Sequence, residues 1–199
     1  MEETTVPNCC MVVVAHADDA EWGCAGSVAL WSSLGSKIVY VICTDGSKGS
    51  DDLTMTSDDL RKVRRSEQEA AAKVLGVQEV VFLGYEDSML EPTLALRKDI
   101  VREIRKFKPD VLITQNPIRS LDNNHYIGHP DHIAAGEATF SAIFPAARDR
   151  LTFPDLIQEG LEPHKVRMIL IPYQDQVADI WIDVSKTIDK AVTALEQHK

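Results

Sequence analysis

The sequence has few cysteines, and their spacing excludes the usual cysteine-based sites. Among 199 residues there are only four, Cys9, Cys10, Cys24 and Cys43, and no two form a C-x-x-C pair. The adjacent pair Cys9–Cys10 is a poor start for a disulfide or a thiolate zinc site. Because Cys10 and Cys43 stand inside apolar runs, we expect reduced, buried or half-buried thiols, as in a cytoplasmic protein.

The chain also lacks an excess of basic residues. It carries 31 acidic and 21 basic side chains, so its formal net charge is −10. Proteins that bind the nucleic-acid backbone recruit Lys and Arg to displace counterions, and anionic membrane surfaces attract the same residues. We therefore expect neither nucleic acid nor a membrane as a partner.

Long apolar runs are missing as well. No stretch approaches the roughly 20 apolar residues of a membrane span. Residues 1–14 lack the basic start and long apolar segment of a signal peptide. Together with the thiols, this favours a cytoplasmic location. The hydrophobic fraction of 44% and the charged fraction of 26% are ordinary for a globular protein. We expect residues 1–199 to form a single domain.

Short apolar runs alternate with longer amphipathic stretches along the chain. The patterns predict strands over 10–15, 37–44, 79–83, 111–115, 168–171 and 178–183. They predict helices over 23–34, 58–75, 94–107, 131–144 and 184–198. Residues 145–165 read as irregular. This alternation is typical of an α/β fold with a Rossmann-like, doubly wound, mainly parallel sheet and helices on both faces. Ligands of such folds bind beyond the carboxyl ends of the strands.

The first predicted strand runs directly into a group of polar side chains. His16, Asp18, Asp19 and Glu21 follow one another within six residues. A single Asp could simply cap the next helix, since an anion is favourable at a helix N-terminus. Two adjacent aspartates with a histidine just before them are more than a cap requires.

A second group lies between residues 125 and 132 and contains three of the six histidines. His129 and His132 are three residues apart around a helix start, so both side chains can face one point. The alternative is a polar loop in which Asp131 caps the helix.

Taken together, the two groups predict a metal site at one edge of the sheet. His16, Asp19 and His132 would supply two nitrogens and one oxygen and leave a position open for water, as in catalytic zinc sites. Asp18 and His129 would then stand beside the metal as acid–base groups. Such a site suits the hydrolysis of a carbonyl compound.

Both groups resemble the signature motifs of the PIG-L/LmbE-like family of de-N-acetylases. The matching segments are Ala-His-Ala-Asp-Asp-Ala-Glu at 15–21 and Gly-His-Pro-Asp-His-Ile-Ala-Ala-Gly at 128–136. Arg64-Arg-Ser-Glu67 is similar to the family's Arg-x-x-Glu helix. The resemblance runs in order from residue 10 to the end of the chain. It implies a zinc enzyme that removes acetyl groups from N-acetylglucosamine-type amino sugars or their conjugates.

The resemblance also implies a role for each matching residue. His16, Asp19 and His132 would be the zinc ligands, with another divalent ion such as Fe²⁺ as an alternative to Zn²⁺. Asp18 would be the general base. His129 would stabilise the oxyanion and act as general acid, with Asp131 orienting it.

Three further residues are candidates for contact with the substrate. Arg64 matches the helix position that faces the family's active site, with Glu67 holding it. Tyr126 lies near a tyrosine that some members use at the scissile amide, but its spacing to His129 is one residue longer than in those members. Asp45, after the second predicted strand, either contacts sugar hydroxyls or forms a turn. Asp87, after the third strand, is similarly placed.

Two departures from the family pattern stand out. Ala17 occupies a position that is more often proline, which would rigidify the loop without ligating the metal. The chain stops at Lys199, where family members usually continue, so a truncated C-terminus is expected. Some members form trimers or hexamers, and the resemblance therefore also implies a homo-oligomer.

Other functions make different demands on the sequence. A nucleotide-binding dehydrogenase needs Gly-x-Gly-x-x-Gly after the first strand, and only Gly23 and Gly26 follow there. A binding or scaffold protein that keeps the fold predicts a broken site, yet every position is filled. A zinc amidase acting on another N-acyl substrate stays open.

The remaining aromatic and histidine residues are expected to be structural. Trp22, Trp31 and Trp181 are interpreted as packing residues. His164 is interpreted as a surface loop residue, and His198 is placed in the last turn of the final helix.

Overall fold

A parallel β-sheet forms the centre of the computed structural model, which describes residues 6–119, 127–172 and 178–199. Within these residues the sheet has five strands in the order β3-β2-β1-β4-β5, and every neighbouring pair is parallel. The strands are β1 (Cys9–Val14), β2 (Lys37–Thr44), β3 (Glu79–Tyr85), β4 (Val111–Thr114) and β5 (Met168–Leu170). The predicted α/β fold with a parallel sheet is confirmed.

The central strand β1 shows why the sheet needs helices on both faces. All six of its residues are buried. Cys9, Met11 and Val13 pack into one apolar cluster. The alternate residues pack into a second cluster. Because successive side chains of a strand point to opposite faces, a continuous apolar run is stable only when both faces are covered.

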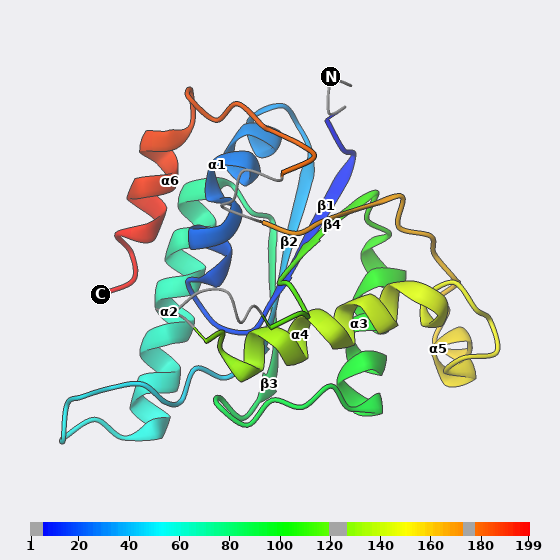
Figure 1. The fold of residues 1–199 in the computed structure, drawn as a ribbon, viewed down its shortest axis with the longest axis horizontal. Helices are drawn as coiled ribbons and strands as arrows, with labels where there is room; N and C mark the ends of the chain where they lie inside the picture. Colours follow the sequence, from blue (N-terminus) through cyan, green and yellow to red (C-terminus); the bar gives the residue numbers. More distant parts are fainter. Residues whose placement is uncertain (1–5, 120–126, 173–177) are drawn as a thin grey trace.

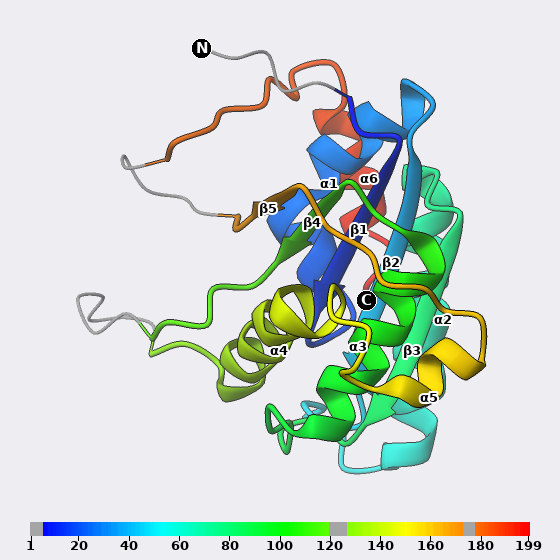
Figure 2. The ribbon, with the colours of Figure 1, turned by 90° about the vertical axis from the view of Figure 1, so that its right-hand side faces the viewer.

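The helices supply the two covers, as Figures 1 and 2 show. On one face lie α1 (Asp19–Ser33), α2 (Ser57–Leu75) and α6 (Ile188–Leu195). On the other lie α3 (Leu94–Phe107), α4 (Pro130–Ser141) and α5 (Pro154–Gln158). A short π-helix over Ala142–Ala146 continues α4.

The strand order places the candidate site. After β3 the chain returns to the other side of β1, so β1 lies between β2 and β4. At such a switch point the loops that follow neighbouring strands separate and leave room for a ligand. The loop after β1 carries His16, and the segment after β4 leads to His129 and His132.

Two predicted helix boundaries differ from the structure. Helix α1 begins at Asp19 rather than at 23, because Asp18 adopts a left-handed backbone conformation and turns the chain straight into the helix. The regular helix predicted over 131–144 ends at Ser141. Phe144 has non-helical backbone angles, and Pro145 cannot donate the backbone hydrogen bond that a regular helix needs.

The C-terminal third was predicted least well. The strand expected over 178–183 is wrong, because these described residues join no ladder of the sheet. Helix α6 covers only Ile188–Leu195 of the helix predicted over 184–198, so the placement of His198 in its last turn is wrong. Helix α5 lies inside the stretch interpreted as irregular. Short apolar segments are ambiguous when their burial depends on distant partners.

The tryptophans divide in the same way. Trp31 is buried between α1 and the sheet, as predicted. Trp22 and Trp181 are 69% and 73% exposed, so the packing role predicted for them is wrong. Trp22 projects from the outer side of the first turn of α1, whose inner residues Ala20 and Glu21 are buried. None of the helices in the described parts is long and apolar enough to cross a membrane.

Candidate active site

Hydrogen bonds to the backbone hold the loop after β1 in place. The carbonyl oxygen of Ala15 accepts hydrogen bonds from the backbone N–H and the hydroxyl of Thr44. The Ala15 N–H donates to the side-chain oxygen of Gln115, which follows β4. The Asp18 N–H donates to Oε1 of Gln68 on α2. Neighbouring strands and a helix therefore set the position of His16 and Asp18.

Asp18 has an unusual backbone conformation, with φ of 83°. This left-handed region costs about 1–3 kcal/mol for a residue with a side chain, and Asp and Asn tolerate it better than most. Strain of this kind persists only where the surroundings enforce it. Here it directs the Asp18 carboxylate away from the helix N-terminus, where it makes no capping hydrogen bond.

The start of α4 brings the second group of side chains to the site. His129 is the N-cap, and its Nδ1 accepts a hydrogen bond of 3.1 Å from the Asp131 N–H. Pro130 occupies the first helical position, which suits its fixed φ. The helix cap is thus His129, not the Asp131 side chain of the alternative interpretation.

Close contact between α4 and the end of β4 fixes this arrangement. At Gly136 an added Cβ would lie 2.4 Å from the backbone oxygen of Gln115. Only glycine allows the helix to approach so closely. The same Gln115 binds the loop after β1, so its backbone and side chain together align both halves of the site.

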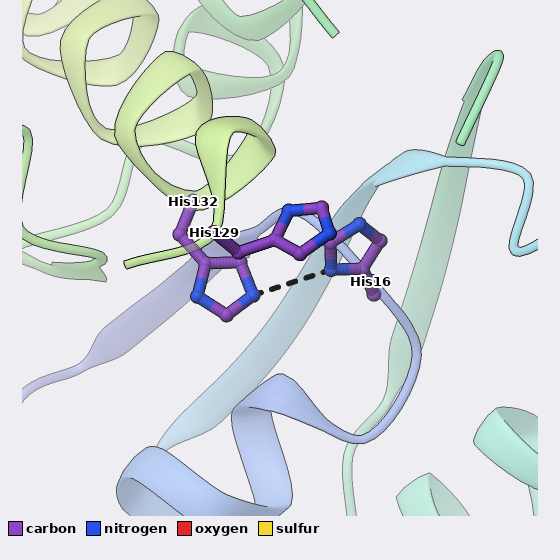
Figure 3. Close-up of side chains that lie close together, drawn as sticks. All are labelled: His16, His129 and His132. Carbon is purple, nitrogen blue, oxygen red and sulfur yellow. Dashed lines mark hydrogen bonds between the residues drawn. The ribbon is translucent and has the colours of Figure 1, made fainter. Parts of the chain in front are cut away.

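Three imidazoles meet at the carboxyl edge of the sheet (Figure 3). His16 comes from the loop after β1, and His129 and His132 come from the start of α4. The ring centroids of His16 and His129 lie 4.7 Å apart, and each lies 5.2 Å from the centroid of His132. The structure therefore brings together the two histidine motifs that the sequence singled out.

The donor atoms of His16, Asp19 and His132, the three ligands expected from the sequence, lie close to one another. His16 Nδ1 lies 3.2 Å from His132 Nε2 and 3.4 Å from Asp19 Oδ2. His132 Nε2 lies 3.1 Å from Asp19 Oδ1. Tetrahedral ligands about 2.0–2.1 Å from Zn²⁺ are about 3.3–3.4 Å from one another. Each histidine approaches a different oxygen of Asp19, and the His129 ring lies close to both histidines as a further candidate ligand.

Two overlapping groups of donor atoms also lie within 4.8 Å of one another. One joins His129 to His16 and His132, and the other joins His16 to Asp87 and Asp131. The carboxylates of the second group approach the opposite nitrogen of His16. Its Nε2 lies 3.1 Å from Asp131 Oδ2 and 3.3 Å from Asp87 Oδ1. A carboxylate behind a ligating histidine fixes the tautomer and orientation of its ring.

Burial and hydrogen bonds fix the position of the Asp131 carboxylate behind His16. Asp131 is 1% exposed, and its carboxylate accepts hydrogen bonds from the backbone N–H groups of Ser88 and Leu90. The resemblance assigns Asp131 to the orientation of His129. In the structure the Asp131 carboxylate contacts His16, and the Asp131 backbone N–H contacts His129. Asp131 can therefore orient both histidines.

The charges of this cluster shift its pKa values. Burial lowers the pKa of His16, but hydrogen bonds to Asp19 and Asp87 outweigh it and raise the pKa to about 10. For Asp19, burial raises the pKa, but contacts with His132 and His16 lower it overall. The pKa of His129 is lowered by burial and by the neighbouring His16. These shifts favour a neutral ring at His129 and an ionised carboxylate at Asp19.

Asp18 directly precedes Asp19 in the chain, and its carboxylate is bound by Arg64. Arg64 Nη2 donates to Asp18 Oδ2 over 2.8 Å and to the Ala17 carbonyl over 2.6 Å. Arg64 Nη1 lies 3.3 Å from Glu67 Oε2, so Glu67 does hold Arg64. Hydrogen bonds to Asp18 outweigh the effect of burial and raise the pKa of Arg64. The Asp18 side chain is still 32% exposed and reachable from outside.

The other two substrate-side candidates differ. Asp45 forms the turn of its alternative interpretation, since its carboxylate accepts from the Ser47 N–H. It also accepts two hydrogen bonds from Arg61, of 3.0 and 2.8 Å. A sugar hydroxyl would have to share this carboxylate. Tyr126 lies outside the described residues, as does His125.

Two glutamines that position the site were not predicted from the sequence. Gln68 follows the Arg-x-x-Glu segment on α2 and is completely buried. Gln115 follows the last residue of β4. Buried side-chain amides are found where backbone groups need hydrogen-bond partners. The position of one glutamine on an apolar helix face and of the other at a strand end could therefore have indicated their role.

Comparison with known proteins agrees with this geometry. Residues 11–143, about two thirds of the chain, match the model of a family described as PIG-L, GlcNAc-PI de-N-acetylase. The chain belongs to the PIG-L family. The matched PIG-L region contains every proposed metal ligand and acid–base group. The family resemblance inferred from the two histidine motifs is confirmed.

Relatives of this PIG-L protein extend the match to almost its full length. The diacetylchitobiose deacetylase of Thermococcus kodakarensis is 30% identical over 189 residues, which are 95% of this chain and 68% of the relative. The structure of N,N'-diacetylchitobiose deacetylase from Pyrococcus horikoshii has a TM-score of 0.88 and 25% identity. The match covers 96% of this chain and 70% of that one.

One structural neighbour has a different chemistry. GalB from Pseudomonas putida, a 4-carboxy-2-hydroxymuconate hydratase, matches with a TM-score of 0.80 at 21% identity over 96% of this chain and 78% of its own. At that identity the likeness shows the fold alone. The fold therefore does not decide the reaction, and the site residues must.

Proposed function

We propose that this protein is a zinc-dependent de-N-acetylase that hydrolyses the acetamido group of an N-acetylglucosamine-type amino sugar or its conjugate. The products are acetate and the free amine. The observation that carries the proposal is the spacing of the His16, Asp19 and His132 donor atoms, with Asp18 beside them. Its PIG-L membership and the names of its relatives support the same reaction class.

The metal would be held by His16 Nδ1, His132 Nε2 and the Asp19 carboxylate, whose two oxygens lie 3.4 Å from His16 Nδ1 and 3.1 Å from His132 Nε2. When bound, Zn²⁺ supplies a Lewis acid that polarises the amide carbonyl and makes water more acidic. Two nitrogens and one oxygen also suit Fe²⁺, which stays the alternative.

Asp18 is placed to take a proton from the attacking water. Arg64 occupies one of its oxygens over 2.8 Å and keeps the carboxylate in one orientation. The side chain is 32% exposed, so a water molecule or a substrate can reach it. Asp18 can later return the proton to the leaving amine, as a general base and then acid.

His129 is placed to donate to the carbonyl oxygen as it becomes negative. Its Nδ1 accepts the Asp131 N–H, so the proton of a neutral ring lies on Nε2. A lowered pKa favours this neutral ring, which donates without adding a positive charge. Preorganised donors of this kind are a large part of catalysis in acyl transfer.

Several finer assignments stay predictions. They are the substrate contacts of Arg64, Tyr126 and Asp45, the assembly into trimers or hexamers, and the cytoplasmic location. A zinc amidase acting on a different N-acyl compound uses the same residues, so the choice of substrate needs a direct measurement.

The decisive experiment measures acetate and free amine released from N-acetylglucosamine and N,N'-diacetylchitobiose. The metal-free protein is loaded separately with Zn²⁺ and Fe²⁺. We expect acetate and amine in equal amounts, and only with metal. Release of neither product from any N-acetylated sugar tested would contradict the proposal. Water addition to an unsaturated acid instead would favour a hydratase like the structural neighbour.

A further inference from the structure

A buried polar cluster lies behind the active site, between α1, α2 and the residues that follow α6. Its members are Glu21 on α1, Glu67 and Gln68 on α2, and His198. The side chains of Glu21 and His198 are 0% and 6% exposed. Figure 1 shows α6 lying beside α1 and α2.

His198 is inserted between the two carboxylates. Its Nε2 lies 3.4 Å from Glu21 Oε2, and its Nδ1 lies 4.0 Å from Glu67 Oε2. Within the described residues neither ring nitrogen has a well-aligned hydrogen bond. A buried imidazole between two buried acids is an expensive arrangement for stability alone, because each group loses its hydration.

Each carboxylate is connected to Asp18 through one further residue. Glu21 accepts two hydrogen bonds of 3.1 Å from Gln68 Nε2, and Gln68 Oε1 accepts the Asp18 N–H. Glu67 contacts Arg64, and Arg64 binds the Asp18 carboxylate. The first path ends on the backbone of Asp18 and the second on its side chain.

The two paths meet at the residue whose conformation most needs support. Asp18 has its φ at 83°, and the surroundings must maintain this angle. Gln68 orients the Asp18 peptide, and Arg64 orients the carboxylate. Glu21 and Glu67 fix the rotamers of Gln68 and Arg64, and His198 separates the two acids. The backbone N–H of Lys199 adds a hydrogen bond of 3.0 Å to Glu67.

We propose that His198 is a positioning residue for the active site, which acts through Glu21 and Glu67 to hold Asp18 in its reactive orientation. The inference rests on the proposed function, since it assumes that Asp18 is the general base. It assigns a role in catalysis to the segment after α6, although none of the proposed metal ligands lies in that segment.

The test compares His198→Ala, His198→Gln and the control His164→Ala, all in the full chain loaded with Zn²⁺. His164 is also partly buried, and its Nε2 lies 2.8 Å from the Pro109 carbonyl oxygen in a loop outside the site. For His198→Ala we expect kcat to fall about ten- to hundredfold, because small displacements of a reacting group have effects of this size. KM and metal content should stay within about twofold of the wild type.

The glutamine variant separates positioning from packing. Its amide can still donate to Glu21 but cannot also face Glu67, so we expect kcat between that of the wild type and that of His198→Ala. The control should keep the wild-type kcat. An unchanged kcat in His198→Ala would overturn the proposal. So would a loss of metal from His198→Ala that is matched by an equal loss of metal from His164→Ala. An inactive wild type would instead contradict the proposed function.

Discussion

At the scale of single residues, Asp18 combines backbone strain with a side chain that two partners orient. Its φ is left-handed, Gln68 accepts its backbone N–H, and Arg64 binds its carboxylate. Asn tolerates the same backbone region, so an amide can replace the acid without refolding the loop. This makes the acid–base role of Asp18 separable from its structural role.

For Asp18→Asn we therefore expect kcat to fall by about 10²–10⁴-fold, the usual contribution of a general base. Metal content should not change, because Asp18 is not among the three spaced donors. Acetate release and metal analysis of the same sample check both statements. Wild-type turnover in this variant would rule out Asp18 as the base.

Asp131 offers a second test at this scale. It supports the nitrogen of His16 that faces away from the proposed metal. In Asp131→Asn one of the two carboxylate charges behind His16 is lost and Asp87 remains, and we expect metal affinity to fall about 10–100-fold. Competition with a chelator measures the change. Asp155→Asn is the control, since its carboxylate pairs with Lys98 on the outer surface. Equal affinity in the wild type and Asp131→Asn would contradict this role.

At the scale of elements, the site depends on how closely α4 approaches the end of β4. This close approach is possible only because Gly136 has no side chain. For Gly136→Ala we expect a loss of about 1–3 kcal/mol in the free energy of unfolding, because the helix must move to relieve the overlap. His132 moves with it, so metal affinity should fall too.

Thermal unfolding and chelator competition measure the two effects of Gly136→Ala. Glu137→Ala, at the exposed neighbouring position of the same helix, should leave both unchanged. A Gly136→Ala protein as stable as the wild type and with the same metal affinity would show that α4 can shift without cost.

How well each helix, strand or contact was predicted depends on whether it is determined by local sequence or by distant partners. Strands β1 and β2 were predicted to within one residue, because they are apolar on both faces and local pattern suffices. The pairing of His16 with His132 was predictable from the motifs and the rule that parallel strands present their ends at one edge. The contact of Asp131 with His16 and the connection of His198 to Asp18 were not, since both depend on side chains from distant helices.

For residues 178–183 the sequence predicted a strand that the described residues do not form. The segment's alternating apolar residues are typical of a strand, yet it pairs with none in the described residues, and Trp181 is exposed. A two-residue periodicity favours an extended backbone, but it does not determine which strand that segment pairs with. Only the arrangement of the whole sheet decides whether a sixth strand can be added.

At the scale of the whole molecule, a bound metal would join both halves of the fold. The ligands come from the loop after β1, the first residue of α1 and the first turn of α4. A ligand that binds only the native state stabilises it by RT ln(1 + [L]/Kd), about 2.7 kcal/mol at a hundredfold excess over Kd.

We therefore expect a chelator to lower the midpoint of thermal unfolding and added Zn²⁺ to restore it. His132→Ala should unfold at the same temperature with and without Zn²⁺, because one of the three donors is gone. Thermal unfolding followed by fluorescence, with each protein measured in both conditions, tests this. An equal response to Zn²⁺ in the variant and the wild type would place the metal elsewhere.

The separation of the ligands along the chain has a consequence for biosynthesis. His16 and His132 are 116 residues apart, and their donor atoms meet only after α4 has docked on β4. A nascent chain that has left the ribosome as far as β3 carries half of the site and cannot hold the ion tightly. If these residues hold the metal as proposed, its loading would follow the emergence of α4, and Asp18 would reach its proposed orientation only once His198 has been synthesised.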